Sequence, residues 1–148
     1  MSKTRSERAL ELFSQQYNCA QSVFAGCAAG DLSEAQRLAL TAPFGGGVAR
    51  QGELCGALTG ALLALGEAKG GAMAADPAAG RKALYEESQQ LIEAFRKAHG
   101  AIRCSELTGC ILATEEGQRV FKEREMHQKL CSKLVTFAVG QVEKTLNL

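Results

Sequence analysis

The 148-residue sequence lacks tryptophan, and only 5% of its residues are aromatic. β-Branched residues rarely cluster either, whereas alanine and leucine are frequent, so the patterns typical of β-strands are nearly absent. The length is that of one ordinary domain with one hydrophobic core. We therefore expect an all-α fold, with residues 1–148 forming a single-domain, compact helical bundle of about six to seven helices.

An excess of charge of one sign is also missing. The 17 Lys and Arg residues balance 16 Asp and Glu residues, giving a formal net charge of +1, and the two signs are interleaved along the chain. Binding to nucleic acid needs clustered basic side chains that neutralise phosphates, so we expect no nucleic-acid partner.

Long hydrophobic runs are absent as well. The longest apolar segment, Leu54 to Gly66, covers 13 residues, whereas a membrane span takes about 20. The first residues lead into an amphipathic pattern and lack the apolar stretch of a signal peptide. These features predict no membrane insertion and a cytoplasmic location.

Cysteine, in contrast, is abundant, with six residues. In a reducing compartment, cysteines are better interpreted as reactive thiols, metal ligands or redox switches than as structural disulfides. None of the six forms a Cys-x-x-Cys pair, so the local signatures of zinc ribbons and thioredoxin-type motifs are missing. Any site built from these cysteines must be assembled by the fold.

Local signals place the expected helices. Asn18 with Gln21 has the spacing of a capping box, and Ser33 is a second candidate cap. Pro77 and Gly100 mark the beginning and end of a long amphipathic helix. The full set of expected helical segments is 5–15, 18–30, 33–42, a segment from 54 or 55 to a glycine-rich break at 66–71, 77–99, a short segment near 104–110, 115–129, and a last helix from about 131.

The sequence around Cys55 carries the most chemical information. Gly56 and Gly60 share one face of the predicted helix, which lets another backbone approach closely. A thiol at a helix start lies near unpaired N–H groups and the positive end of the helix dipole, which favour the thiolate. Arg50, on the preceding glycine-rich loop, can add to this effect. Three more cysteines fall at predicted helix starts: Cys19, Cys104 and Cys131.

The remaining candidates have simpler interpretations. Cys27 and Cys110 fall within or at the end of helical runs, where a small apolar residue would serve equally well, so we interpret them as core residues. His99 and His127 are expected to be ordinary surface residues. The glycine triplet at 45–47 lacks the Gly-Lys-Ser/Thr ending of a phosphate-binding loop.

Four separated elements together resemble one known family. They are Tyr17-Asn18-Cys19-Ala20-Gln21, then Phe44-Gly45-Gly46-Gly47 followed by Cys55-Gly56-Ala57-Leu58-Thr59-Gly60, then Cys104-Ser105-Glu106-Leu107-Thr108-Gly109, and Cys131 followed by Lys133-Leu134-Val135. This order resembles the C_GCAxxG_C_C family of small redox-active proteins, which has four cysteines and a Cys-Gly-Ala-x-x-Gly motif. The resemblance implies a redox or metal-linked role for Cys19, Cys55, Cys104 and Cys131.

Three functions stay open at this point. In the first, the protein is a thiol–disulfide oxidoreductase with an unidentified redox partner, in which Cys55 is the low-pKa nucleophile and another of the four cysteines resolves it. In the second, the same four thiolates bind zinc or an iron–sulfur cluster. In the third, there is no cofactor, the thiols only pack, and the protein is a helical interaction module that forms a homodimer.

Overall fold

The computed structural model describes residues 2–148, which contain no β-strand and eight α-helices. The all-α prediction is confirmed, but the expected number of six to seven helices is too low. The helices are α1 (Arg5–Ser14), α2 (Cys19–Cys27), α3 (Glu34–Thr41), α4 (Gly56–Lys69), α5 (Pro77–His99), α6 (Cys104–Thr108), α7 (Glu115–Glu123) and α8 (Ser132–Leu146). Two 3₁₀ turns, η1 (Ala42–Phe44) and η2 (Gly70–Ala74), and a π-helical turn, η3 (His127–Cys131), complete the list.

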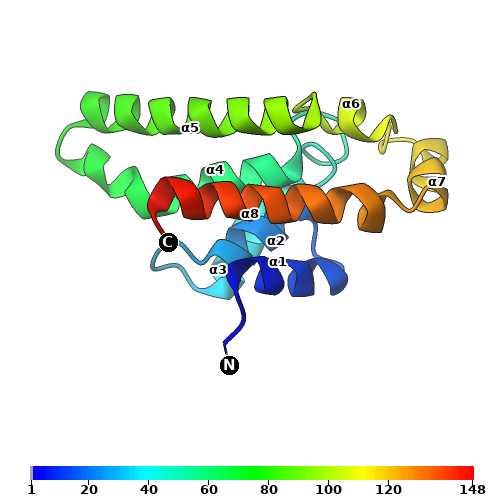
Figure 1. The fold of residues 1–148 in the computed structure, drawn as a ribbon, viewed down its shortest axis with the longest axis horizontal. Helices are drawn as coiled ribbons and strands as arrows, with labels where there is room; N and C mark the ends of the chain where they lie inside the picture. Colours follow the sequence, from blue (N-terminus) through cyan, green and yellow to red (C-terminus); the bar gives the residue numbers. More distant parts are fainter. Residues whose placement is uncertain (1) are drawn as a thin grey trace.

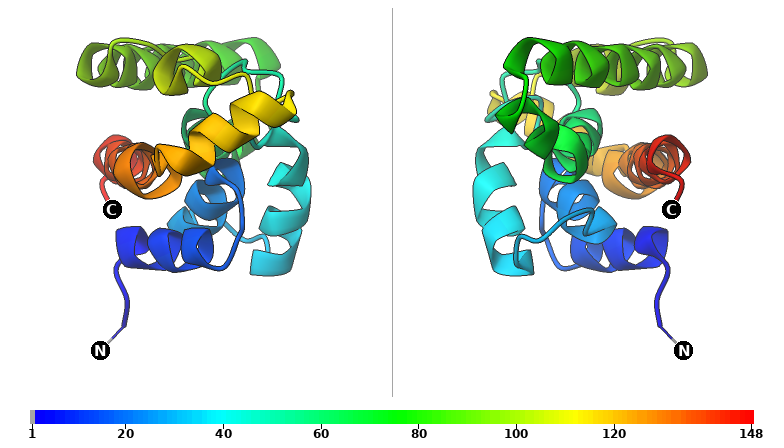
Figure 2. Two further views of the ribbon diagram at one scale, coloured as in Figure 1. Left: turned by 90° about the vertical axis from the view of Figure 1, so that its right-hand side faces the viewer. Right: turned by 90° about the vertical axis from the view of Figure 1, so that its left-hand side faces the viewer.

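The helices stack in layers around one apolar core (Figures 1 and 2). The long helix α5 lies along one side, α4 and α8 run through the middle, and α1 and α2 form the opposite side. Helix α8 contacts α1, α2, α4 and α5, and α4 contacts α2, α5 and α8. In the described residues, no helix has both the length and the apolar character needed to pass through a lipid bilayer.

Helix boundaries follow the predicted caps closely. The side chain of Asn18 accepts the N–H of Gln21 while Gln21 accepts the N–H of Asn18, and Ser33 and Gln36 repeat this arrangement at α3. Helix α5 begins directly after Asp76 and ends at Gly100, whose φ of 83° lies in the left-handed region that glycine adopts without strain.

The chain departs from the predicted segments at two places. Helix α4 continues through the expected glycine break as far as Lys69. The expected helical stretch 115–129 stops at Glu123 and turns at Glu125, whose φ is 53°, before the π-helical turn η3 leads directly into α8.

Helices α2 and α4 approach each other closely. A Cβ atom added at Gly60 would lie 2.7 Å from the carbonyl oxygen of Ala20 and 2.9 Å from the Cβ of Val23. At Gly56, the same atom would lie 3.1 Å from the backbone nitrogen of Ala20. The predicted close-packing face of α4 is therefore confirmed, and it brings the N-terminal ends of α2 and α4 together.

A buried ion pair fixes the segment between α2 and α3 to α4. The guanidinium of Arg37 lies 2.9 Å from the carboxylate of Glu67, and both side chains are nearly excluded from solvent, at 5% and 6% exposure. Glu67 also accepts the N–H of Leu32, and Arg37 also donates to the carbonyl of Gly30. These contacts give both charged groups polar partners, which lowers the free-energy cost of burying them. They also fix the position from which the chain enters the loop before α4.

The α2–α4 contact can be tested with a matched pair of glycine substitutions on α4. We expect Gly60→Ala to lower the free energy of unfolding by roughly 1–3 kcal/mol, because the added methyl group overlaps backbone atoms of α2. Gly66→Ala is the control: no atom beyond its own stretch of helix lies within 4 Å of its added Cβ, so the helix propensity of alanine should stabilise the protein by up to about 1 kcal/mol. Urea denaturation measures both. Equal effects of the two substitutions would contradict the close approach.

Candidate functional site

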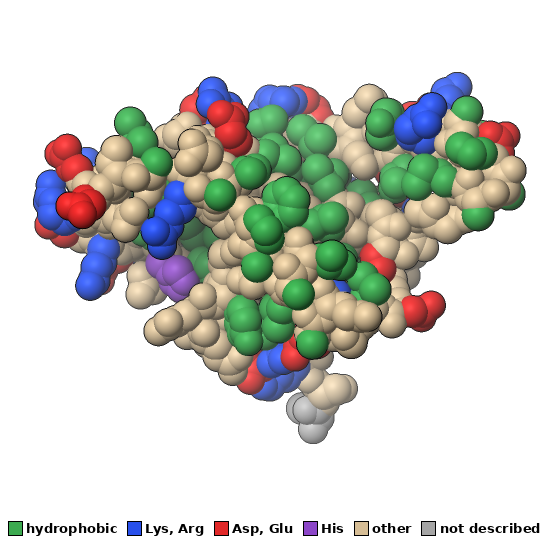
Figure 3. All heavy atoms as spheres, turned by 180° about the vertical axis from the view of Figure 1, so that it is seen from behind, with side chains coloured by type: hydrophobic (Ala, Val, Ile, Leu, Met, Phe, Trp, Pro, Cys, Tyr) green, Lys and Arg blue, Asp and Glu red, His purple; other side chains and the backbone are tan. Residues whose placement is uncertain are grey.

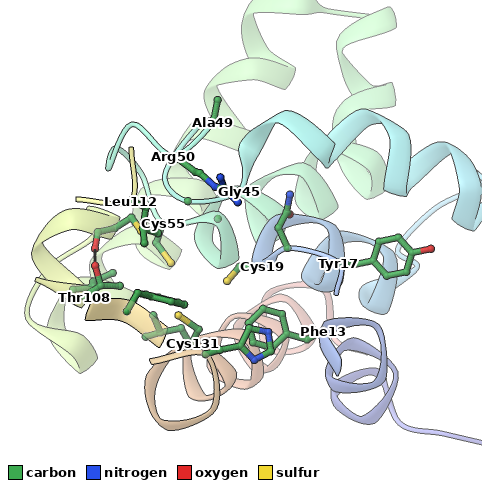
Figure 4. Close-up of a pocket in the computed structure, with 18 of the residues that line it drawn as sticks. Phe13, Tyr17, Cys19, Gly45, Ala49, Arg50, Cys55, Thr108, Leu112 and Cys131 are labelled. Carbon is green, nitrogen blue, oxygen red and sulfur yellow. Dashed lines mark hydrogen bonds between the residues drawn. The ribbon is translucent and has the colours of Figure 1, made fainter. Parts of the chain in front are cut away.

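A cavity of about 720 Å³ lies where α2, α4 and α6 begin and where η3 enters α8. Cys19, Cys55, Cys104 and Cys131 all line it, so the structure brings together the four cysteines that the sequence singled out. Figure 4 shows the sulfur atoms of Cys19, Cys55 and Cys131 directed toward its interior from different helices. Cys27 and Cys110 are buried and do not line the cavity, in agreement with their interpretation as core residues.

Two short segments hold Cys55 and Cys104 next to each other. The N–H of Cys55 donates to the carbonyl of Ile102 at 2.8 Å, and the N–H of Cys104 donates to the carbonyl of Glu53 at 2.7 Å. Between them, Leu54 and Arg103 form an isolated antiparallel bridge. The start of α4 is therefore joined to the start of α6 by backbone hydrogen bonds.

The expectation of four cysteines at four free helix starts holds for three of them. Cys19 and Cys104 are the first residues of α2 and α6, and Cys55 is the N-cap of α4. Cys131 is different, because the π-helical turn η3 runs into α8 without a break and gives Cys131 helical φ and ψ values of −61° and −36°. Its thiol therefore has no free helix N-terminus beside it.

The prediction that Cys55 has a low pKa is wrong. Burial raises the pKa of the Cys55 thiol to about 12, although the N–H groups of Ala57 and Leu58 act against this shift. Burial also raises the pKa of Cys104 to about 11, and charge on Cys131 adds to the effect. A helix start stabilises a thiolate only when the thiol keeps enough contact with polar surroundings, and here desolvation has the larger effect.

Cys131 is the cavity cysteine whose pKa is lowered. A hydrogen bond from the Cys19 side chain lowers the pKa of Cys131, against the opposing effect of burial. The same contact raises the pKa of Cys19, because Cys19 keeps its proton as the donor. Cys19 and Cys131 therefore influence each other's protonation inside the cavity.

Aromatic packing gives the two histidines half-buried positions, contrary to the expectation of ordinary surface residues. The ring of His127 stacks on Phe13, with centroids 3.7 Å apart and planes 8° apart, and both residues line the cavity. His99 contacts Phe95 and Phe137 edge to face. Burial lowers the pKa of both histidines, so the imidazole of His127 is neutral at pH 7.

The glycine-rich loop forms one wall of the cavity in an uncommon conformation. Residues 46–50 all have positive φ, including the non-glycine residues Val48, Ala49 and Arg50 at 64°, 48° and 64°. Hydrogen bonds to carbonyls five or six residues back, such as Ala49 to Pro43 at 2.7 Å, hold this left-handed turn closed. Because side chains disfavour this conformation, the surrounding structure must determine it.

Two observations bear on the chemical state of the cysteines. All six are free thiols in the structure. Across residues 2–148, no three Cys, His, Asp or Glu side chains stand close enough together to hold a metal ion. The assignment of Cys19, Cys55, Cys104 and Cys131 as metal ligands therefore stays a prediction.

Comparison with known proteins identifies one family. The family described as "Putative redox-active protein (C_GCAxxG_C_C)" matches residues 17–145, a range that includes all four cavity cysteines. Neither the curated proteins nor the solved structures gave a match to the chain.

The effect of Cys19 on the pKa of Cys131 can be tested by residue-specific alkylation. We expect Cys19→Ala to slow the reaction of Cys131 with iodoacetamide near pH 7 roughly tenfold, because loss of a hydrogen bond to a charged group raises the pKa of Cys131. Cys19→Ser keeps a donor and should stay closer to the unmodified protein. Mass spectrometry across a pH series gives the midpoint for each cysteine. An unchanged midpoint for Cys131 in Cys19→Ala would rule out the pairing.

Proposed function

Because this chain belongs to the C_GCAxxG_C_C family of redox-active proteins, we propose that it is a thiol–disulfide oxidoreductase whose reactive pair is Cys131 and Cys19. The observation that carries this proposal is the position of Cys19 and Cys131 on the wall of one cavity, which is large enough for a small substrate and in which each residue shifts the pKa of the other. Two thiols that face the same cavity can form a disulfide once their sulfur atoms meet.

The reaction begins with the Cys131 thiolate, which attacks one sulfur of a substrate disulfide. A bond forms between the protein and that sulfur, the substrate S–S bond breaks, and the leaving thiolate takes up a proton. Cys19 then loses its proton and attacks the sulfur of Cys131, which releases the second substrate thiol. The substrate gains two electrons, and the protein is left with a Cys19–Cys131 disulfide.

Cys55 and Cys104 have a secondary part in this proposal. Their raised pKa values keep both thiols protonated at neutral pH, so they react more slowly than Cys131. They lie within each other's electrostatic influence, which supports a second dithiol able to carry two further electrons. The nucleophilic role first assigned to Cys55 thus passes to Cys131.

The free thiols also support the proposed cellular setting. Six unpaired cysteines in one chain are typical of a reducing compartment, so we propose that the protein acts in the cytoplasm. There, a cellular reductant or a protein partner returns the disulfide to the dithiol form.

A cysteine-ligated zinc ion or iron–sulfur cluster is a second candidate, because one cavity holds four thiols. The donor set fits such a group chemically, and Cys19, Cys55, Cys104 and Cys131 would hold it. The bound group would supply charge that favours all four thiolates, reversing the raised pKa values of three of them. The spacing of the side chains fits less well, since no three stand close enough together.

A helical interaction module is the third candidate. Hydrophobic side chains gather over the middle of the face shown in Figure 3, and most of the charged side chains lie toward its margins. Leu40, Tyr85 and Ile111 are the most exposed large hydrophobic residues, at 58%, 58% and 65%. Such exposed apolar residues are compatible with a homodimer.

One experiment separates the three candidates. Protein purified without oxygen and without affinity-tag metal is analysed for metal content and visible absorbance, and its free thiols are counted before and after treatment with an equimolar disulfide. We expect metal-free protein that loses two thiols and yields a Cys19–Cys131 disulfide in peptide mapping. Cys131→Ser should abolish this loss, whereas the control Cys27→Ser, at a buried site outside the cavity, should preserve it.

Two results would contradict the oxidoreductase. Stoichiometric zinc or iron that is lost in Cys55→Ser would establish the ligand site. Metal-free protein whose thiols do not react with any disulfide would favour the interaction module.

A further inference from the structure

The cavity has an uneven distribution of charge. Among the described residues that line it, Arg50 is the only one with a formal positive charge at pH 7, and none is Asp, Glu or Lys. Cys131, which attacks as a thiolate in the proposed reaction, lines the same cavity. An anionic substrate approaching Cys131 would therefore meet repulsion unless another group on the wall offsets it.

The guanidinium of Arg50 is available to offset this repulsion. Within residues 2–148, it forms no ion pair and no hydrogen bond, whereas Arg8, Arg37 and Arg103 are each paired with a glutamate. Figure 4 shows the Arg50 side chain along the rim of the cavity. A cation at a cavity rim that has no partner in the protein can bind an anionic group of a ligand.

The backbone of the glycine-rich loop fixes where Arg50 stands. Its N–H donates to the carbonyl of Gly45 at 3.0 Å, and its Cα lies 2.9 Å from the position that a Cβ on Gly46 would occupy. A left-handed conformation is strained for a residue such as arginine, and it persists only where the surroundings enforce it. The chain therefore accepts strain at the position that carries the cation.

The rest of the wall is largely apolar and includes Phe13, Leu112, Phe121 and Leu134. The cavity volume of about 720 Å³ lies in the usual range for small-molecule sites. We propose that Arg50 is a specificity-determining residue that selects small disulfides carrying a carboxylate or similar anionic group. This proposal rests on the proposed oxidoreductase function, and the exchange itself is the balanced two-electron reaction between substrate and Cys19–Cys131 given above.

The test compares three disulfides that differ in charge: dithiodiglycolate, which is anionic, hydroxyethyl disulfide, which is neutral, and cystamine, which is cationic. Fully reduced protein is mixed with each in single-turnover experiments, and the loss of protein thiols is followed. In Arg50→Gln, the rate with dithiodiglycolate should fall roughly fivefold, the effect of losing about 1 kcal/mol from a solvent-exposed charge contact. The rate with hydroxyethyl disulfide should change less than twofold, since this substrate reports on the thiols alone.

Two further variants isolate the charge. Arg50→Lys keeps the positive charge and should keep most of the preference for the anionic disulfide. Arg81→Gln removes the same charge from α5, at a residue that does not line the cavity, and should preserve the preference. Raising the salt concentration should weaken the preference in the unmodified protein because the contact is exposed to solvent.

The outcomes separate this inference from the function it rests on. If all three disulfides react but Arg50→Gln leaves their relative rates unchanged, the role of Arg50 is wrong and the oxidoreductase stands. A fall of the same size for all three disulfides in Arg50→Gln would also overturn it, since that result indicates a structural role. If no disulfide oxidises the unmodified protein, the oxidoreductase function itself fails.

Discussion

The site depends on the near contact of two backbones, at Gly56 and Gly60 of α4 against Ala20 of α2. With any larger residue at Gly60, the two helices would have to move apart, and the thiols at their N-terminal ends would separate with them. The same helix α4 is buried on most of its surface and contacts α8. Helix α8 continues directly from the π-helical turn that carries Cys131. One close-packed helix therefore sets the relative positions of thiols that lie far apart in the sequence.

Within the cavity, desolvation and hydrogen bonding compete for control of each thiol. Cys55 has two backbone N–H groups beside it and still keeps its proton, because burial disfavours the charged form more strongly. Cys131 is also buried, yet the influence of the neighbouring Cys19 thiol lowers its pKa. The chemistry of the four cysteines is therefore decided by which side chain donates to which, and less by the position of each in its helix.

The range over which each interaction acts explains how much of the fold and of the site could be predicted from the sequence. Capping residues such as Asn18 and Ser33 act within a few residues, so the helix boundaries they set could be predicted, as could the close-packing face around Gly60. The grouping of four cysteines in one cavity followed from their motifs. The short helix α6 has too few residues for a periodic pattern, so the sequence indicated it only through the helix start at Cys104 and Ser105. The effect of Cys19 on the pKa of Cys131 and the stacking of His127 on Phe13 link distant parts of the chain, and no local pattern encodes them.

The position of the reactive pair also ties the redox state to the folding equilibrium. A covalent link between Cys19 and Cys131 would close a loop across most of the chain, from the start of α2 to the start of α8. In the chain-entropy description, closing a loop of about 100 residues disfavours the unfolded state by roughly 4–5 kcal/mol. The thermodynamic cycle then requires the folded protein to hold the disulfide more tightly than the unfolded chain by the same amount. The fold that brings the two sulfurs together is therefore also a determinant of their reduction potential.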